Sequence, residues 1–114
     1  MKNSKKSVFL EIISKKSSKI LYQDNYVTAF RDINPKAPVH ILIVSNELIP
    51  TLNNIKSRHK NLFSSFFLAA KKIAKKEKIS DSGYRIVINC NKDAGQEIYH
   101  LHMHLLGGKK LKKI

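Results

Sequence analysis

Apolar and polar residues follow a helical period at the start of the chain and a strand-like pattern soon after it. Residues 7–14 place their apolar side chains on one side of a short helix. Residues 20–22 and 26–31 are rich in β-branched and aromatic side chains, and the polar triplet 23–25 separates them. Such triplets form tight turns, so the pattern predicts a β-hairpin after the helix.

Two longer apolar segments follow. Residues 39–44 are almost continuously apolar, which is typical of a strand buried on both faces. The preceding residues 34–38 contain two prolines and therefore predict a loop, because proline cannot donate to a paired ladder. From residue 57 to residue 78 the period becomes helical and predicts one long helix. Its two apolar rows are Leu62, Phe66, Ala70, Ile73 and Phe63, Phe67, Ala74.

The last part of the chain predicts two more strands. They cover residues 84–91 and 98–106, with a polar loop at 91–95 between them and a glycine pair after the second. We therefore expect an α+β fold, with a five-stranded, mainly antiparallel sheet, one long helix and one short helix. The length predicts a single domain over residues 1–114, with a core at about 8–108 and a short basic tail at 109–114.

Composition narrows the class of protein. Hydrophobic residues make up 42% of the 114 residues, which suffices for one core. The single cysteine, Cys90, cannot form an intramolecular disulfide and is expected in the core of a cytoplasmic protein. No apolar run approaches the roughly 20 residues of a membrane-spanning helix. Glu11 interrupts the apolar stretch near the lysine-rich N-terminus, so a secretory signal is not expected.

The net charge of +14 raises the alternative of a nucleic-acid or acidic-membrane partner. The 22 basic residues include only three arginines, Arg31, Arg58 and Arg85, although bidentate arginine is favoured for phosphate recognition. The lysines are spread along the chain. We therefore expect a solvated surface without specific nucleic-acid or membrane binding.

Three histidines occur at alternate positions in the last predicted strand. Because successive side chains of a strand face opposite ways, His100, His102 and His104 would share one face at spacings of about 6.5 to 7 Å. This spacing admits a structural role, a zinc site using two imidazoles, or phosphate chemistry. Gly95 and Gln96 lie just before the strand, where a glycine lets backbone N–H groups approach an anion, and this favours phosphate.

Three segments resemble the histidine triad family, in the form of its Hint branch of nucleoside phosphoramidases. Residues 93–108, with the sequence DAGQEIYHLHMHLLGG, resemble the triad signature. Residues 30–40, FRDINPKAPVH, resemble the first nucleotide-binding segment of that branch, and residues 83–89, GYRIVIN, resemble the second. The resemblance implies a homodimeric hydrolase that cleaves P–N bonds of purine nucleoside 5′-phosphoramidates such as lysine-linked AMP. It implies no metal and no cofactor.

The resemblance also implies residue roles. His102 would attack the α-phosphorus and form a covalent nucleotidyl-imidazole. His104 and backbone N–H groups near Gln96 would hold the phosphate oxygens. His100 would orient the triad, and His40 would join it in moving a proton toward the leaving amine. The residues expected to bind the substrate are Phe30, Asp32, Ile33, Asn89, Gly95, Gln96, Glu97 and His104.

Several positions depart from the family pattern or have another interpretation. The Glu97 carboxylate would repel a phosphate, so only its backbone is expected to contribute. Residues 45–48 lack the proline and histidine of several relatives, and Lys16 stands where an apolar contact with the base is common. Asp32 alternatively caps the turn at Asn34. His59, in a lysine-rich segment, is expected at the surface.

Two rival functions stay open at this point. One is a dinucleoside polyphosphate hydrolase or nucleotidyl transferase of another triad branch. The other is a basic nucleic-acid-binding or regulatory module whose triad is vestigial. The ending Leu105-Leu106-Gly107-Gly108 favours the Hint branch.

Overall fold

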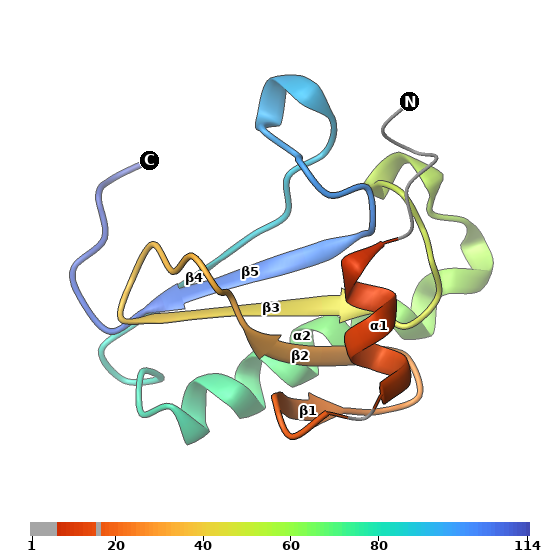
Figure 1. The fold of residues 1–114 in the computed structure, drawn as a ribbon. Coiled ribbons are helices and arrows are strands. Elements are labelled where there is room, and N and C mark those ends of the chain that lie inside the picture. Colours follow the sequence, from red (N-terminus) through yellow and green to blue (C-terminus); the bar gives the residue numbers. More distant parts are fainter. Residues whose placement is uncertain (1–6, 16) are drawn as a thin grey trace.

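The structure is a computed structural model that describes residues 7–15 and 17–114. Lys16, where the family pattern differs, lies outside the described residues. The helices and strands follow one another along the chain in the order that the sequence predicts (Figure 1). They are α1 (Val8–Lys15), β1 (Ile20–Gln23), β2 (Val27–Arg31), β3 (Val39–Ser45), α2 (Lys60–Lys76), β4 (Tyr84–Val87) and β5 (His102–Gly107).

The five strands form one antiparallel sheet in the order β1-β2-β3-β5-β4. The α+β fold is therefore confirmed. In the turn between β1 and β2, the Asp24 carboxylate accepts hydrogen bonds from the N–H groups of Tyr26 and Val27 at 2.7 and 2.9 Å. In the centre of the sheet, β3 pairs with β5 so that Val44 lies opposite His102 and Leu42 lies opposite His104.

The two faces of the sheet carry different layers (Figure 1). On one face, the inward side chains of β3 and β5, including Ile41, Ile43, Met103 and Leu105, pack against α2 in the main core. On the other face, a smaller apolar cluster contains Phe9 of α1. Because side chains alternate, His102, His104 and Leu106 of β5 face away from α2. The sheet thus presents the two imidazoles on the face that α1 partly covers.

The ends of three predicted elements differ from the structure. The long helix begins at Lys60 rather than 57, because residues 57–59 form a separate 3-10 turn. The strand predicted over 84–91 ends at Val87. The last strand begins at His102 instead of residue 98. Leu101 instead exchanges backbone hydrogen bonds with the loop after β3, at Ser45 and Ile49, which draws this stretch away from the ladder.

Two side-chain expectations require correction. His59 is buried, although a surface position was predicted. Its Nδ1 accepts the Lys56 N–H at 2.9 Å, and its Nε2 lies 3.3 Å from a Glu47 carboxylate oxygen. Lysine-rich surroundings therefore concealed a histidine held by local hydrogen bonds. Cys90 is only half-buried, because β4 has already ended and the alternation that placed it in the core no longer applies.

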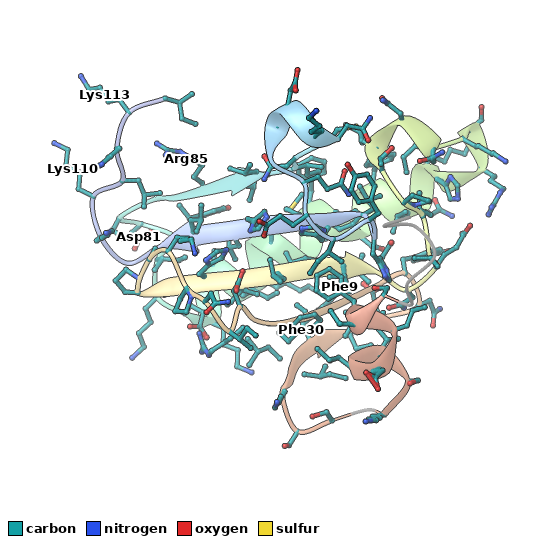
Figure 2. All side chains as sticks on the ribbon, turned by 45° about the horizontal axis from the view of Figure 1, so that its top comes forward. Phe9, Phe30, Asp81, Arg85, Lys110 and Lys113 are labelled. Atoms are coloured by element: carbon teal, nitrogen blue, oxygen red, sulfur yellow. The ribbon has the colours of Figure 1, made fainter. Side chains whose placement is uncertain are left out.

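Some of the basic side chains lie away from the aromatic residues Phe9 and Phe30. Figure 2 shows Arg85, Lys110 and Lys113 toward the end where the chain terminates, away from Phe9 and Phe30. Within the described ranges, no helix has the length and apolar character that crossing a membrane requires.

Candidate active site

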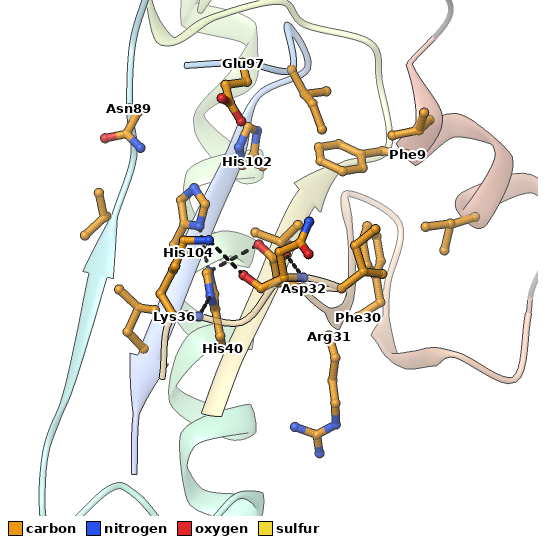
Figure 3. A pocket seen from close by; sticks show the side chains of 18 of the residues that line it. Phe9, Phe30, Arg31, Asp32, Lys36, His40, Asn89, Glu97, His102 and His104 are labelled. Atoms are coloured by element: carbon orange, nitrogen blue, oxygen red, sulfur yellow. Dashed lines mark hydrogen bonds and ion pairs between the residues drawn. The ribbon is translucent and has the colours of Figure 1, made fainter. Parts of the chain in front are cut away.

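A cavity of about 1010 Å³ opens on the face of the sheet opposite α2. Its walls come from α1, from the loop between β2 and β3, from the loop before β5, and from the outward side chains of β3 and β5 (Figure 3). Of the residues predicted for the site, all but His100 line this cavity. They are Phe30, Asp32, Ile33, His40, Asn89, Gly95, Gln96, Glu97, His102 and His104.

His102 has one ring nitrogen fixed and one available. Its Nδ1 lies 2.6 Å from the carbonyl oxygen of His100. A carbonyl can only accept, so Nδ1 carries the hydrogen and the neutral ring keeps its lone pair on Nε2. The ring of Phe9 packs on this imidazole with centroids 5.2 Å apart. Burial lowers the pKa of His102 against the opposing effect of its bond to the His100 carbonyl. A neutral nucleophile is therefore available near pH 7.

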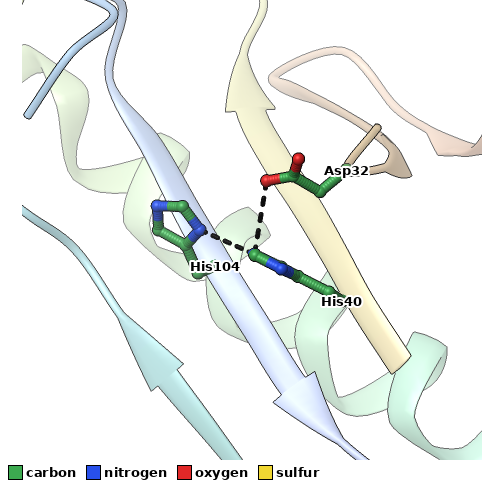
Figure 4. A group of neighbouring side chains, drawn as sticks. All are labelled: Asp32, His40 and His104. Atoms are coloured by element: carbon green, nitrogen blue, oxygen red, sulfur yellow. Dashed lines mark hydrogen bonds and ion pairs between the residues drawn. The ribbon is translucent and has the colours of Figure 1, made fainter. Parts of the chain in front are cut away.

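The His40 ring is fixed by a backbone donor. Its Nδ1 accepts the N–H of Lys36 at 2.9 Å, so the neutral ring carries its hydrogen on Nε2. That Nε2 lies 2.9 Å from Nδ1 of His104 and 3.4 Å from Oδ2 of Asp32 (Figure 4). His40 therefore donates to His104, which must carry its own hydrogen on Nε2. The Lys36 N–H thus fixes the tautomer of His40, and His40 in turn fixes the tautomer of His104.

Burial also controls the charge of this pair. It lowers the pKa of His104 to about 4, with further contributions from His102 and His40. Desolvation likewise lowers the pKa of His40, and Asp32 acts in the opposite direction. Both imidazoles are thus neutral at physiological pH. His104 then offers a neutral N–H donor to whatever occupies the cavity.

His100 is fully buried and lies outside the cavity lining. Its Nε2 donates to the carbonyl of Ser45 at 2.6 Å, and its Nδ1 accepts from the hydroxyl of Ser7 at 2.7 Å. Burial lowers the pKa of this imidazole as well. With both ring nitrogens occupied, His100 has the geometry of an orienting residue and not of a proton donor to a ligand.

The two oxygens of Asp32 have different surroundings. Oδ1 accepts the N–H of Asn34 at 2.8 Å, which is the turn-capping geometry. Oδ2 lies beside His40 in the cavity wall. The turn-capping and ligand-binding interpretations are therefore compatible, because one oxygen holds the turn and the other faces the cavity.

The loop before β5 is held by the buried side chain of Gln96. Its oxygen accepts the N–H of Asn91 at 2.8 Å, and its amide group donates to the carbonyls of Pro50 and Ile98. The backbone N–H of Gln96 donates to the Asn91 carbonyl, and that of Gly95 donates to Lys92, so these amides are already engaged. Gly95 meets the need for a φ of +84°, and a Cβ there would have no neighbour within 4 Å. The positive φ is one reason for a glycine here, and the approach of an anion stays a prediction.

The rim of the cavity combines apolar and charged groups. Phe9 and Phe30 pack together with ring centroids 5.6 Å apart and form an aromatic wall. Ile33, expected against a base, is 88% exposed at the rim. The exposed Glu97 side chain lies near His102 in Figure 3. Asn89 is half-buried in the wall beyond β4.

Asp32, His40 and His104 form the group of described residues that could hold a metal ion, with potential ligand atoms within 4.8 Å of one another. The tautomers oppose this role. A metal requires the lone pair of His40 Nε2, but the Lys36 N–H keeps that lone pair on Nδ1. Coordination would therefore break a buried backbone hydrogen bond.

Sequence reasoning missed two contributors to the site. Phe9 was expected only as part of an apolar helix face, yet its ring contacts both His100 and His102. Lys36 acts through its backbone N–H, which no side-chain pattern reports. Two prolines flank Lys36 in the sequence, and this was the available sign of a fixed loop conformation.

Comparison with known proteins identifies the family of this chain. The profile of the HIT domain matches residues 14–111. A HIT-like protein of Buchnera aphidicola from Acyrthosiphon pisum is 57% identical over 93% of this chain and 94% of its own length. The purine nucleoside phosphoramidase of Escherichia coli is 49% identical over 95% of this chain and 92% of its own. A HIT family hydrolase from Clostridium thermocellum superposes with a TM-score of 0.90 and 39% identity, covering 96% of both chains. The chain belongs to the HIT domain family.

Proposed function

We propose that this protein is a purine nucleoside phosphoramidase, which hydrolyses the P–N bond of substrates such as lysine-linked AMP through a nucleotidyl-histidine intermediate. The observation that carries the proposal is the state of His102. Its Nδ1–H is held by the His100 carbonyl at 2.6 Å, and its Nε2 lone pair is left for the cavity. The likeness to the Escherichia coli phosphoramidase supports the choice of substrate class.

The reaction proceeds in two balanced steps. In the first, the Nε2 lone pair of His102 forms a bond to the α-phosphorus while the P–N bond breaks, and its electron pair stays on the amine. The nucleotidyl-imidazole carries a positive charge, and its Nδ1–H remains bonded to the His100 carbonyl. In the second step, water attacks the phosphorus, and the bond from phosphorus to Nε2 breaks with its electron pair left on His102. The proton that the water loses passes to solvent, from which the pair of His40 and His104 took the one given to the amine. AMP and neutral His102 result.

The leaving amine needs a proton, and the pair of His40 and His104 is arranged to deliver it. Neutral His104 has its remaining N–H on Nε2. An additional proton can occupy His104 Nδ1 only if the Nε2–H of His40 turns away. Asp32 Oδ2, 3.4 Å from that nitrogen, is the alternative acceptor. Asp32 would thus stabilise the protonated pair as well as contact the substrate.

The rest of the cavity fits a nucleoside monophosphate. The aromatic wall of Phe9 and Phe30 would contact the purine, with Ile33 at the rim. Asp32 Oδ2 would accept from the ribose hydroxyls. The amides of Gly95 and Gln96 are engaged within their loop, so the backbone contact to phosphate falls to the following residue, Glu97. The Asn89 amide would complete the wall.

Substitution of His102 tests the proposal. His102→Ala should abolish AMP release from lysine-linked AMP while leaving AMP affinity within about tenfold, because it removes the covalent step and little of the pocket. His59→Ala is the matched control, since it truncates a similarly buried histidine that does not line the cavity. Rapid quenching of the wild type should trap labelled AMP on His102. Turnover by His102→Ala, or label on another residue, would contradict the mechanism.

A direct comparison of substrates separates this function from its enzymatic rival. The proposal requires lysine-linked AMP to be turned over faster than diadenosine polyphosphate. The opposite preference would assign the chain to a polyphosphate-cleaving branch. Loss of all turnover with retained nucleotide binding would favour a vestigial triad.

We further propose a cytoplasmic homodimer of single-domain chains. The free Cys90 supports a reducing compartment. Two surface features support self-association. In the sheet, β4 is an edge strand, and on α2 the side chains of Phe67 and Leu68 are more than half exposed. Light scattering should give a molar mass of twice that of the chain, and Phe67→Asp should reduce this mass to that of a single chain.

A further inference from the structure

The last residue before α1 contacts the triad from outside the cavity. The Ser7 hydroxyl lies 2.7 Å from Nδ1 of His100 and also accepts the N–H of Phe9 at 3.1 Å. Ser7 is buried but does not line the cavity. Because the Nε2 of His100 already donates to Ser45, the hydroxyl must be the donor to Nδ1. The Ser45 carbonyl therefore sets the tautomer of His100, and Ser7 helps to hold the orientation of its ring.

The effect continues from His100 to the proposed nucleophile. The His100 carbonyl accepts the Nδ1–H of His102 at 2.6 Å, and this bond alone determines which ring nitrogen holds the free lone pair. The His100 ring is held at opposite nitrogens by Ser7 and by Ser45, and it lies just before β5 begins. The peptide that carries this carbonyl is held on one side by the Leu101 N–H, which donates to the Ile49 carbonyl at 2.7 Å, and the anchoring of the His100 ring holds the residue on the other side.

We propose that Ser7 is a positioning residue for the triad: its hydroxyl anchors the His100 ring so that the His100 carbonyl holds His102 ready for attack. The inference rests on the proposed phosphoramidase function. It gives Ser7 a role in the chemical step, although Ser7 does not line the substrate cavity.

A simpler role for Ser7 is to cap α1, since its oxygen accepts the Phe9 N–H at the helix start. The two roles predict opposite rankings of substitutions. Aspartate caps a helix as well as serine and better than threonine, but an ionised carboxylate has no hydrogen to donate to Nδ1. Threonine keeps the hydroxyl donor. Activity in the order Ser, Thr, then Asp and Ala indicates positioning, whereas Asp equal to Ser and above Thr indicates capping alone.

The test measures kcat and KM for lysine-linked AMP on the full chain. Ser7→Ala should lower kcat about tenfold to a hundredfold with KM within about twofold, because misplaced reacting groups slow the chemical step more than they weaken binding. Ser7→Thr should restore kcat to within about threefold, and Ser7→Asp should not. Ser14→Ala is the matched control, because it removes an exposed hydroxyl from the other end of the same helix.

Nitrogen-15 NMR of the histidine rings gives a second readout, which helix capping alone would not change. In the wild type, the nitrogen-15 chemical shifts should show that the ring hydrogen is on Nε2 of His100 and on Nδ1 of His102. Ser7→Ala should turn the His102 signals into a mixture of tautomers, even if the variant is destabilised. Wild-type kcat and an unmixed His102 tautomer in Ser7→Ala would overturn the inference. An inactive wild type would instead refute the proposed function.

Discussion

Burial of the imidazoles should shift the acid limb of the pH–rate profile far below the usual histidine range. Burial lowers the pKa of His102, and it lowers that of His104 to about 4. At pH 5.5, an imidazole of pKa 6.5 is only about 9% neutral, whereas one of pKa about 4 is about 97% neutral. Protonated His104 would place a second hydrogen in the 2.9 Å contact with His40. The neutral forms are therefore the resting forms, from which His102 attacks.

The expected result is a loss of kcat/KM between pH 7.5 and pH 5.5 that is well below the loss of about tenfold that an ordinary histidine would give. AMP release from lysine-linked AMP measures it, after subtraction of the rate without enzyme. The phosphorus group of this substrate carries one negative charge across the range, so its own titration does not interfere.

Phe9→Ala tests the cause. The Phe9 ring covers both His100 and His102, and its removal admits water, which raises the pKa of His102 toward its ordinary value. The ratio of kcat/KM between pH 7.5 and pH 5.5 should then approach about tenfold. Phe9→Leu keeps an apolar cover and should retain the flat profile. The reasoning would be refuted by a wild-type pH–rate profile whose acid limb has its midpoint near pH 6.5, or by identical profiles for wild type and Phe9→Ala.

Four further results are expected. The free energy of unfolding, measured with urea, should be greatest above the unfolded histidine pKa of about 6.5 and should fall as the pH decreases toward 4. The buried histidines have lowered pKa values, so in this range only the unfolded chain takes up protons. The slope is at most about 1.4 kcal/mol per pH unit per histidine. Asp32→Ala should reduce the preference for ribose over 2′-deoxyribose by about tenfold, and equal wild-type rates on both sugars would leave only the turn-capping role. Chelator dialysis should leave the rate unchanged; loss restored by stoichiometric zinc would revive the metalloenzyme alternative. DNA binding should disappear by about 0.15 M salt, and sequence-selective binding that persists there would show a specific interface.

The sequence was a good guide wherever a side-chain pattern continued over several residues. The β3 strand, buried on both faces, and the amphipathic α2 helix follow from such patterns, and the order of elements is confirmed. Local hydrogen bonds overrode the pattern elsewhere. The start of β5 moved to His102 because Leu101 bonds to the loop after β3. His59 is buried because Lys56 and Glu47 satisfy its ring, and neither contact has a periodic signature.

The residue types at the site were predictable, but their protonation was not. The alternation of β5 brings His102 and His104 to one face, and the sheet register brings His40 beside them. Which nitrogen of each ring carries hydrogen depends on the backbone partners of three rings: the Lys36 N–H for His40, the Ser45 carbonyl for His100 and the His100 carbonyl for His102.

These backbone groups explain why three similar histidines can act differently. An imidazole whose Nδ1 donates to a carbonyl is a nucleophile at Nε2, as His102 is arranged to be. An imidazole whose Nδ1 accepts from another ring becomes an N–H donor at Nε2, as His104 does. An imidazole with both nitrogens occupied can only orient its neighbours, as His100 does. Because the three side chains are chemically identical, their roles follow from their positions in the chain and not from the residue type. The backbone of the loop after β2, of the last residue of β3 and of the residues just before β5 assigns each role by position.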